Sequence, residues 1–195
     1  PVEGTEYVIA VRAVGSTESA WSDELCAIYL EKPVQVSYSG NVLSWSPVIG
    51  AASYEVQIND EAVITVNGGV TCSEITLPKA GINRLKVRFA DGSNHSDWAT
   101  IDVFAHTVTF DSRGGSPVNA QYVAVGDRIT LPSPTKTGYD FIAWYNVPGG
   151  PVCNGGIYTD EVFSESGSIV LYAYYTSVGV NVTLNAGPEA GGDKI

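Results

Sequence analysis

Hydrophobic and polar residues alternate in many short runs along the chain, which predicts β-strands joined by turns. In residues 53–59, tyrosine, valine and isoleucine occupy every second position, with Glu55 and Gln57 between them. This period of two is typical of a strand with one buried face. Long segments with hydrophobic residues at the helical spacing are absent from the sequence. We therefore expect an all-β to β-rich chain.

Residues 32–105 contain seven segments of this kind, separated by turns. The segments are residues 35–38, 41–46, 53–59, 62–66, 72–77, 84–89 and 100–104. Short strands with turn residues roughly every 8–12 positions are typical of a two-sheet β-sandwich. We expect residues 32–105 to form one complete sandwich.

The end of this pattern also occurs earlier, in residues 1–31. Val-Arg-Ala at 11–13 precedes a turn and Trp21, as Val-Arg-Phe at 87–89 precedes a turn and Trp98. A piece as short as residues 1–31 cannot bury a core alone. We interpret it as the C-terminal strands of a truncated domain of the same kind. The chain contains no methionine, and we take it as a fragment of a longer protein.

Residues 106–176 follow a different pattern and are expected to form a separate small module. A strand at 108–110 leads into Gly114-Gly115, which predicts a turn. Residues 138–145 read Gly-Tyr-Asp-Phe-Ile-Ala-Trp-Tyr, and their aromatic side chains are large enough to anchor a core. The other elements expected are strands at residues 122–125 and 128–131 and one short helix near residues 160–163.

The last residues, 177–195, begin with a further copy of this module. Val-Thr-Leu-Asn at 182–185 repeats Val-Thr-Phe-Asp at 108–111. The copy is incomplete, so both ends of the chain cut through repeated units. This arrangement predicts that the parent protein is a tandem array.

Composition and charge narrow the possible functions. The formal net charge is −11 and the pI is about 4.4, so the surface repels phosphate backbones and nucleic-acid binding is not expected. No apolar run approaches the roughly 20 residues that span a bilayer, so we expect no membrane insertion by this segment.

Two stretches of residues 32–105 carry a family resemblance. Leu-Ser-Trp-Ser-Pro at 43–47 and Gly-Ala-Ala-Ser-Tyr-Glu-Val at 50–56 closely resemble bacterial fibronectin type III domains. The resemblance implies that Trp45 is a core tryptophan and that Tyr7, in the first copy, is a corner tyrosine. Asn83 stands at that corner in the second copy, where we expect it to loosen the corner. The chain has no Arg-Gly-Asp tripeptide, so integrin binding is not supported.

The module at 106–176 resembles the Listeria–Bacteroides repeat, also called the internalin B-repeat family. The resemblance rests on residues 108–115, on the aromatic motif at 138–145 and on Leu-Tyr-Ala at 171–173. It implies a small β-grasp module that occurs in tandem on secreted and surface-attached microbial proteins. The family has Lys-Trp after Leu-Tyr-Ala, whereas this chain has Tyr174-Tyr175. We expect Tyr175 to fill the aromatic core position.

The sequence offers no catalytic, metal-binding or cofactor-binding constellation. The cysteines lie in three different modules without a CxxC pair, and we expect each to be a small buried hydrophobe: Cys26, Cys72 and Cys153. The two histidines, His95 and His106, have no triad or ligand pattern nearby. Four aspartates are expected to cap turns rather than to bind calcium: Asp111, Asp127, Asp140 and Asp160. Exposed aromatic side chains are the ligand-contact candidates: Tyr158, Tyr172 and Tyr174, with Tyr38 as a further one.

We expect a non-enzymatic spacer or adhesion segment of a large secreted, cell-surface or cell-wall-associated microbial protein. Short linkers such as Ala105-His106 limit bending between neighbouring modules of the chain. Two alternatives stay open. The segment can itself bind a host glycoprotein or a polysaccharide, or it can be an accessory part of an extracellular glycoside hydrolase whose carboxylates lie elsewhere.

Overall fold

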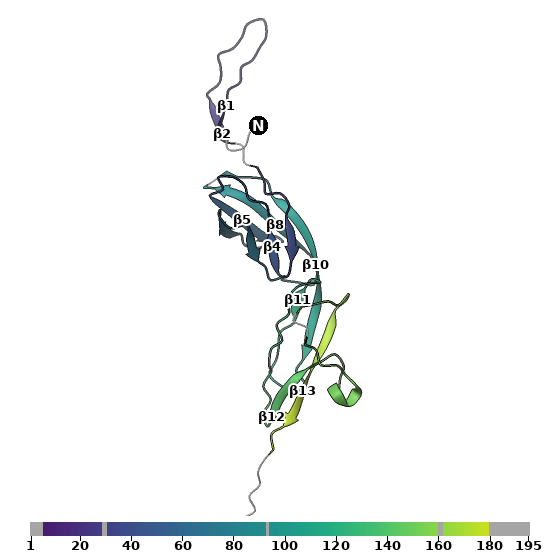
Figure 1. The fold of residues 1–195 in the computed structure, drawn as a ribbon. Coiled ribbons are helices and arrows are strands. Elements are labelled where there is room, and N and C mark those ends of the chain that lie inside the picture. Colours follow the sequence, from purple (N-terminus) through teal and green to yellow (C-terminus); the bar gives the residue numbers. More distant parts are fainter. Residues whose placement is uncertain (1–5, 29–30, 93, 160–161, 180–195) are drawn as a thin grey trace, which may run out of the picture. The chain divides into compact units, whose positions relative to one another are not determined.

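The computed structural model describes residues 6–28, 31–92, 94–159 and 162–179, which form strands and one turn of 3-10 helix (Figure 1). The prediction of an all-β chain is confirmed. The chain forms two compact units. The first draws on Pro1–Thr109, Asn119–Leu131 and Thr159–Val170, and the second on Phe110–Val118, Pro132–Tyr158 and Leu171–Ile195.

Residues 32–105 form a sandwich of two antiparallel sheets. The smaller sheet has the order β3 (Ser37–Ser39), β4 (Val42–Ser44), β7 (Cys72–Glu74). The larger sheet has the order β10 (Ala99–Asp111), β8 (Gly81–Asp91), β5 (Ser53–Ile58), β6 (Ile64–Asn67), and β9 (Asn94–His95) pairs with the end of β8. The seven predicted strands are confirmed, and β9 is an additional short one.

The sandwich core contains the residues that alternate inward on both sheets. Leu43 of the smaller sheet and Trp45, directly after β4, share one buried cluster with Tyr54, Val56 and Leu85 of the larger sheet. The rings of Trp45 and Tyr54 meet edge to face, with centroids 5.3 Å apart. The Tyr54 hydroxyl accepts a hydrogen bond from the backbone N–H of Val48 at 2.7 Å. The expected core role of Trp45 is confirmed.

Asn83 closes the corner at the start of β8. Its side chain is fully buried and donates hydrogen bonds to the carbonyl oxygens of Lys79 at 2.9 Å and Gly81 at 3.2 Å. Its amide oxygen accepts a hydrogen bond from Nδ2 of Asn59 at 3.3 Å. The amide of Asn83 thus satisfies two backbone carbonyls at this corner, while the expectation that Asn83 loosens the corner stays a prediction.

A small polar cluster fastens the hairpin between β8 and β10. The Ser96 hydroxyl accepts a hydrogen bond from the backbone N–H of Phe89 at 3.1 Å, and the Phe89 carbonyl accepts one from the N–H of Ser96 at 3.1 Å. The Arg88 guanidinium lies 4.4 Å from the centre of the Trp98 ring, a cation–π contact.

The same cluster recurs in residues 6–28, where β1 (Glu6–Ile9) pairs with β2 (Leu25–Ile28). The Ser19 hydroxyl accepts from the N–H of Ala13 at 2.9 Å, and the Ala13 carbonyl accepts from the N–H of Ser19 at 3.0 Å. The guanidinium of Arg12 lies 4.7 Å from the centre of the Trp21 ring. The sequence repetition is therefore matched by the same contacts.

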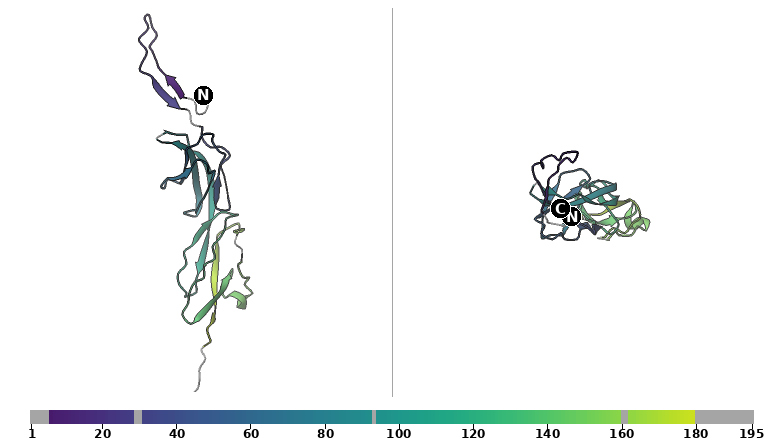
Figure 2. Two further views of the ribbon diagram at one scale, coloured as in Figure 1. Left: turned by 60° about the vertical axis from the view of Figure 1, so that its left-hand side comes forward. Right: turned by 90° about the horizontal axis from the view of Figure 1, so that it is seen from above.

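Strand β10 runs without a break past the end of the sandwich (Figures 1 and 2). Its residues 99–105 pair with β8, and its next residues, His106–Val108, pair with β11 (Gln121–Val123). The prediction that Ala105-His106 is a linker is wrong, because both residues lie inside one strand. The expected strand at 122–125 is confirmed as β11.

The second unit is built around the predicted aromatic motif. Strand β12 (Tyr139–Tyr145) pairs with β13 (Ile169–Ser177), whose residues from Leu171 belong to this unit. Trp144 is buried, its ring centroid lies 4.9 Å from that of Phe110, and its Nε1–H donates to the Pro132 carbonyl at 2.7 Å. Tyr175 packs against the ring of Phe141 but is half-buried, so it lies at the margin of the core rather than inside it.

Some expected elements lie elsewhere or outside the described residues. Residues 128–131 form no strand and make only an isolated bridge, between Arg128 and Val162. The 3-10 helix η1 lies at Gly150–Cys153, whereas the helix expected near 160–163 falls partly on residues 160–161, which are not described. The further copy expected at 177–195 lies outside the described residues beyond residue 179.

Candidate functional site

A buried carboxylate lies where residues 119–131 meet the sandwich, within the first unit. Asp127 is 0% exposed. Its Oδ2 accepts hydrogen bonds from the Tyr38 hydroxyl at 2.7 Å and from the N–H of Ala124 at 2.8 Å, and its Oδ1 accepts one from the N–H of Asn41 at 3.0 Å. Burying an isolated charge is costly, so these three donors are what stabilises the carboxylate here.

Tyr38 is the side chain of the sandwich that reaches this carboxylate. Burial disfavours its phenolate and raises the pKa of the hydroxyl far above the ordinary value, and the hydrogen bond to Asp127 and the charge of Asp127 raise it further. The hydroxyl therefore stays protonated and remains a donor. Tyr38 is a sequence-based candidate for ligand contact, but it is half-buried and its hydroxyl donates its hydrogen bond to Asp127.

The turn between β3 and β4 supplies the second partner. Gly40 and Asn41 have φ angles of 58° and 67°, as in the two-residue hairpin turns that match the twist of the strands. Beyond its N–H bond to Asp127, Asn41 accepts hydrogen bonds from the N–H of Arg128 at its Oδ1, at 2.6 Å, and from the N–H of Ile75 at its carbonyl, at 2.7 Å. We call this set the Asp127 joint: Tyr38, Asn41, Ala124, Asp127 and Arg128.

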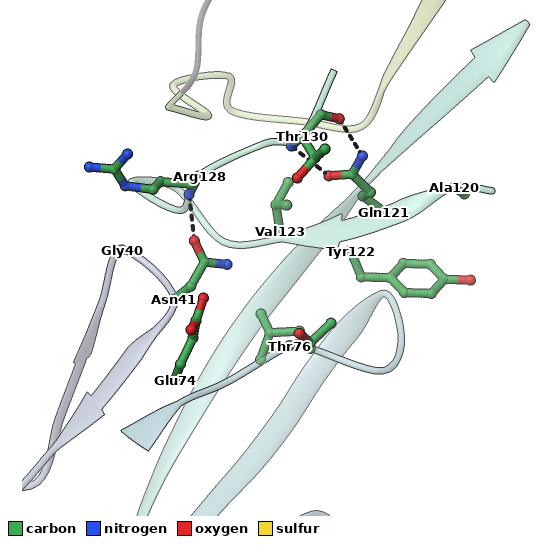
Figure 3. A pocket seen from close by; sticks show the side chains of 11 residues that line it. Gly40, Asn41, Glu74, Thr76, Ala120, Gln121, Tyr122, Val123, Arg128 and Thr130 are labelled. Atoms are coloured by element: carbon green, nitrogen blue, oxygen red, sulfur yellow. Dashed lines mark hydrogen bonds between the residues drawn. The ribbon is translucent and has the colours of Figure 1, made fainter. Parts of the chain in front are cut away.

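A groove of about 470 Å³ lies beside the Asp127 joint, also within the first unit (Figure 3). One wall comes from the sandwich, with Asn41, Glu74 and Thr76, and the other from residues 120–130. Gln121 stiffens that second wall, because its amide exchanges two hydrogen bonds with the backbone of Thr130, at 2.5 and 3.0 Å. Pockets between folded segments are common places for ligands.

Comparison with known proteins places the end of β10, β11, β12 and most of β13 in one family unit. Residues 106–174 match the family model of the Listeria-Bacteroides repeat domain. The resemblance predicted from the sequence is confirmed over these residues, which we call the repeat module. The match does not cover residues 1–105, for which the fibronectin type III resemblance stays a prediction. No curated protein matches the chain.

The three tyrosines proposed as ligand contacts all lie in the repeat module. Tyr158 is buried, with 9% of its surface exposed, so the expectation of an exposed side chain is wrong there. Its backbone N–H donates to the Trp144 carbonyl at 2.8 Å, which draws this residue against β12. Tyr172 and Tyr174 are half-buried neighbours on one face of β13, and the ring of Tyr174 packs on that of Tyr145.

The other chemically versatile residues are scattered. Cys26, Cys72 and Cys153 are exposed, so the expectation that they are buried hydrophobes is wrong. His95 lies 3.3 Å from a carboxylate oxygen of Glu55. Within residues 6–28, 31–92, 94–159 and 162–179, no three His, Cys, Asp or Glu side chains are grouped as metal ligands. In the same ranges, no helix has the length and apolar character to cross a membrane.

Turn capping by aspartate is confirmed at two of the four predicted positions. Asp127 caps the turn of residues 124–127, where its own N–H donates to the Ala124 carbonyl. Asp111 accepts a hydrogen bond from the N–H of Arg113 at 2.9 Å. Asp140 is exposed, and Asp160 lies outside the described residues. The sequence did not predict that Asp127 also binds the sandwich, because its partner Asn41 is far away in the chain.

Proposed function

We propose that this segment is a non-catalytic spacer in a large modular protein that microbes secrete or display on the cell surface. The Listeria-Bacteroides repeat domain is typical of surface-associated modular proteins, and this supports the proposed location. The immediate partners of each module are then its neighbours in the same chain. A spacer needs defined joints between modules, since its work is to hold other domains at a distance.

The observation that carries the proposal is the way the sandwich continues into the repeat module. Strand β10 is paired on both sides of the Ala105–His106 bond, so the backbone there is fixed by two ladders. The Asp127 joint adds hydrogen bonds between the turn of the sandwich and residues 124–128. Ladder and joint together restrict rotation about the connection more than a free linker does.

Residues 1–105 are proposed to be fibronectin type III-like: a β-hairpin unit at 1–31 and a two-sheet domain at 32–105. The two-sheet antiparallel sandwich with its buried Trp45 supports this for residues 32–105. The repeated Ser, Arg and Trp contacts support a common origin for the two hairpins. The β-grasp assignment of the repeat module is likewise a proposal, as is the start of another repeat at 177–195.

The spacer proposal is tested by a distance distribution across the connection. The variant Cys26→Ser/Cys153→Ser/Val125→Cys leaves two exposed positions for spin labels, Cys72 in the sandwich and position 125 in the 119–131 segment. Pulsed electron paramagnetic resonance should give one narrow peak for the distance between the two spin labels. Adding Asp127→Ala should broaden the peak, whereas Asp102→Asn, at an exposed ion pair, should not. A broad distribution without Asp127→Ala contradicts a stiff spacer.

The two alternative functions predict other results. An accessory role in a glycoside hydrolase is compatible with the same stiffness but requires a catalytic domain elsewhere in the parent protein. Direct adhesion predicts that truncating the side chain of Tyr172 or Tyr174 weakens binding to a host glycoprotein or polysaccharide. Hydrolysis of a polysaccharide by the purified chain contradicts the non-enzymatic assignment.

A further inference from the structure

We propose that the groove beside the Asp127 joint binds one or two units of an uncharged glycan. The groove is a defined space of about 470 Å³, within the size range of small-ligand pockets. Its lining combines polar side chains with the apolar side chains of Leu77 and Val123. It also includes Tyr122, whose ring packs partly against the sandwich core. The proposal is independent of the spacer function.

Asn41 presents a preorganised donor. Its N–H, carbonyl and Oδ1 are held by Asp127, Ile75 and Arg128, which leaves Nδ2 as its one polar atom without a partner among the described residues. Figure 3 shows Nδ2 turned toward the interior of the groove, away from the Arg128 bond. A fixed donor loses little conformational freedom when it binds a ligand oxygen.

Glu74 and Thr76 provide the complementary groups on the same wall. Both are exposed, and neither side chain has a hydrogen bond or ion pair within the described part of the chain. Figure 3 shows the Glu74 carboxylate directly beside Asn41, with Thr76 next along the wall. A carboxylate that accepts from two hydroxyls beside an amide that donates to a third oxygen suits adjacent hydroxyl groups of a sugar ring.

Charge excludes anionic ligands from this interior. Glu74 carries the negative charge inside the groove, and the chain has a net charge of −11. Arg128 is the cation of the lining, but Figure 3 shows its guanidinium pointing away from the other labelled side chains, toward the rim. A sulfated or uronic-acid glycan would therefore be repelled where an uncharged one can bind.

The test is a titration of the ¹⁵N-labelled 195-residue chain with cellobiose, maltose and N,N′-diacetylchitobiose, followed by amide chemical shifts. The expected result is saturable shifts from at least one of these probes, confined to Asn41, residues 74–77 and residues 120–130. Glu74→Gln should raise the dissociation constant about tenfold, because a charge-assisted hydrogen bond is lost. Thr76→Val should raise the dissociation constant by a smaller factor.

Matched controls keep the test decisive. Glu61→Gln and Thr65→Val change exposed residues outside the groove and should leave the dissociation constant unchanged. Thermal unfolding of each variant checks that it is folded. Three outcomes overturn the proposal: no shifts with any of the three sugars, shifts centred on other residues, or an equal response in the groove to triglycine with blocked ends.

Discussion

At the scale of single residues, we expect substitution of Asp127 to have a large effect on stability. A carboxylate with no exposed surface accepts three hydrogen bonds, and its partners come from β3, from the turn after it and from Ala124. Removing one member of such a set leaves the other buried groups without partners, which costs more than the bond itself contributes.

Asp127→Ala is therefore expected to destabilise the first unit by about 3 kcal/mol, since buried donors lose their acceptor. Tyr38→Phe is expected to cost about 1.5–3 kcal/mol, the range for a hydrogen bond to a charged group. Urea unfolding followed by tryptophan fluorescence measures both. Asp102→Asn is the control, because Asp102 forms an exposed pair with Arg84. A cost for Asp127→Ala no larger than for this control would contradict the assigned role.

The raised pKa of Tyr38 also predicts a dependence on alkaline pH. The folded state keeps this phenol protonated above the ordinary value of 10.0, whereas the unfolded chain loses the proton there. The stabilisation from Tyr38 is thus complete below pH 10 and declines as the pH rises further. The free energy of unfolding should fall more steeply above pH 10 for the wild-type chain than for Tyr38→Phe. Parallel curves would show that Tyr38 contributes nothing to the slope.

Gly115 is a residue that the packing of the second unit requires. A Cβ at this position would overlap the Tyr175 hydroxyl oxygen and would lie 3.0 Å from the carbonyl oxygen of Thr135. That hydroxyl donates to the Ser112 carbonyl at 2.9 Å, so Gly115→Ala must displace it. We expect a loss of about 1–3 kcal/mol, as for other overpacked sites.

Removing the obstructing oxygen should recover part of this loss. In a double-mutant cycle by urea unfolding, Gly115→Ala should cost less in the Tyr175→Phe background than in the wild type. Gly167→Ala serves as the matched control, because an added Cβ there has no neighbour within 4 Å. Strict additivity of the two changes would mean that the hydroxyl is not the obstacle.

At the scale of elements, the period-two pattern predicted the strands well because each strand buries one face. Six of the seven strands of the sandwich lie within the predicted segments or extend them by at most three residues at an end. The exception is β10, Ala99–Asp111, which joins the segment predicted at 100–104 to the strand predicted at 108–110. The pattern gave the wrong prediction of a linker at Ala105-His106. Alternation continues through both residues, and it does not indicate that Ala105 pairs with β8 and His106 with β11. It also failed at residues 128–131, where Thr130 bonds to the Gln121 side chain instead of a neighbouring strand.

The candidate site was less predictable than the strands. The Val-Gly-Asp turn at 125–127 and the Gly-Asn turn at 40–41 are both recognisable as turns from the sequence alone. Their pairing depends on where β10 brings β11 relative to β3, and no local pattern encodes this. Tyr158 was misjudged for the same reason, because its burial depends on a distant strand rather than on its neighbours in sequence.

The two copies of the Ser, Arg and Trp cluster allow one element to be compared in two settings. Ser96 is buried and accepts from the N–H of Phe89, so Ser96→Ala should cost about 1–3 kcal/mol. Ser19 makes the same bond at an exposed position, so Ser19→Ala should cost less than about 0.5 kcal/mol. Amide hydrogen exchange of Phe89 and Ala13 measures each effect locally. Equal losses would show that burial does not set the strength of this contact.

At the scale of the whole molecule, the chain has separate cores rather than one. Leu43, Tyr54 and Val87 are buried in the first unit, and Trp144 with Phe110 in the second. Units with their own cores can unfold at different temperatures, which breaks two-state behaviour.

Differential scanning calorimetry is thus expected to give a calorimetric enthalpy larger than the van't Hoff enthalpy. Asp127→Ala should lower the transition of the first unit, and Gly115→Ala that of the second, which assigns the two transitions. The control, Gly167→Ala, should shift neither by more than about 2 °C. A single transition with equal enthalpies would mean that the two units unfold together.

The continuity of β10 has a consequence for load. Seven residue pairs join Ala99–Ala105 of β10 to Gly81–Val87 of β8. When the chain is pulled at Asp111 along the axis of β10, these rungs are sheared and must yield together instead of peeling apart one by one. Force along this strand therefore acts on the sandwich in a shear geometry, in which the hydrogen bonds between β10 and β8 share the load. The contacts of Ser96 hold the hairpin that joins these two strands.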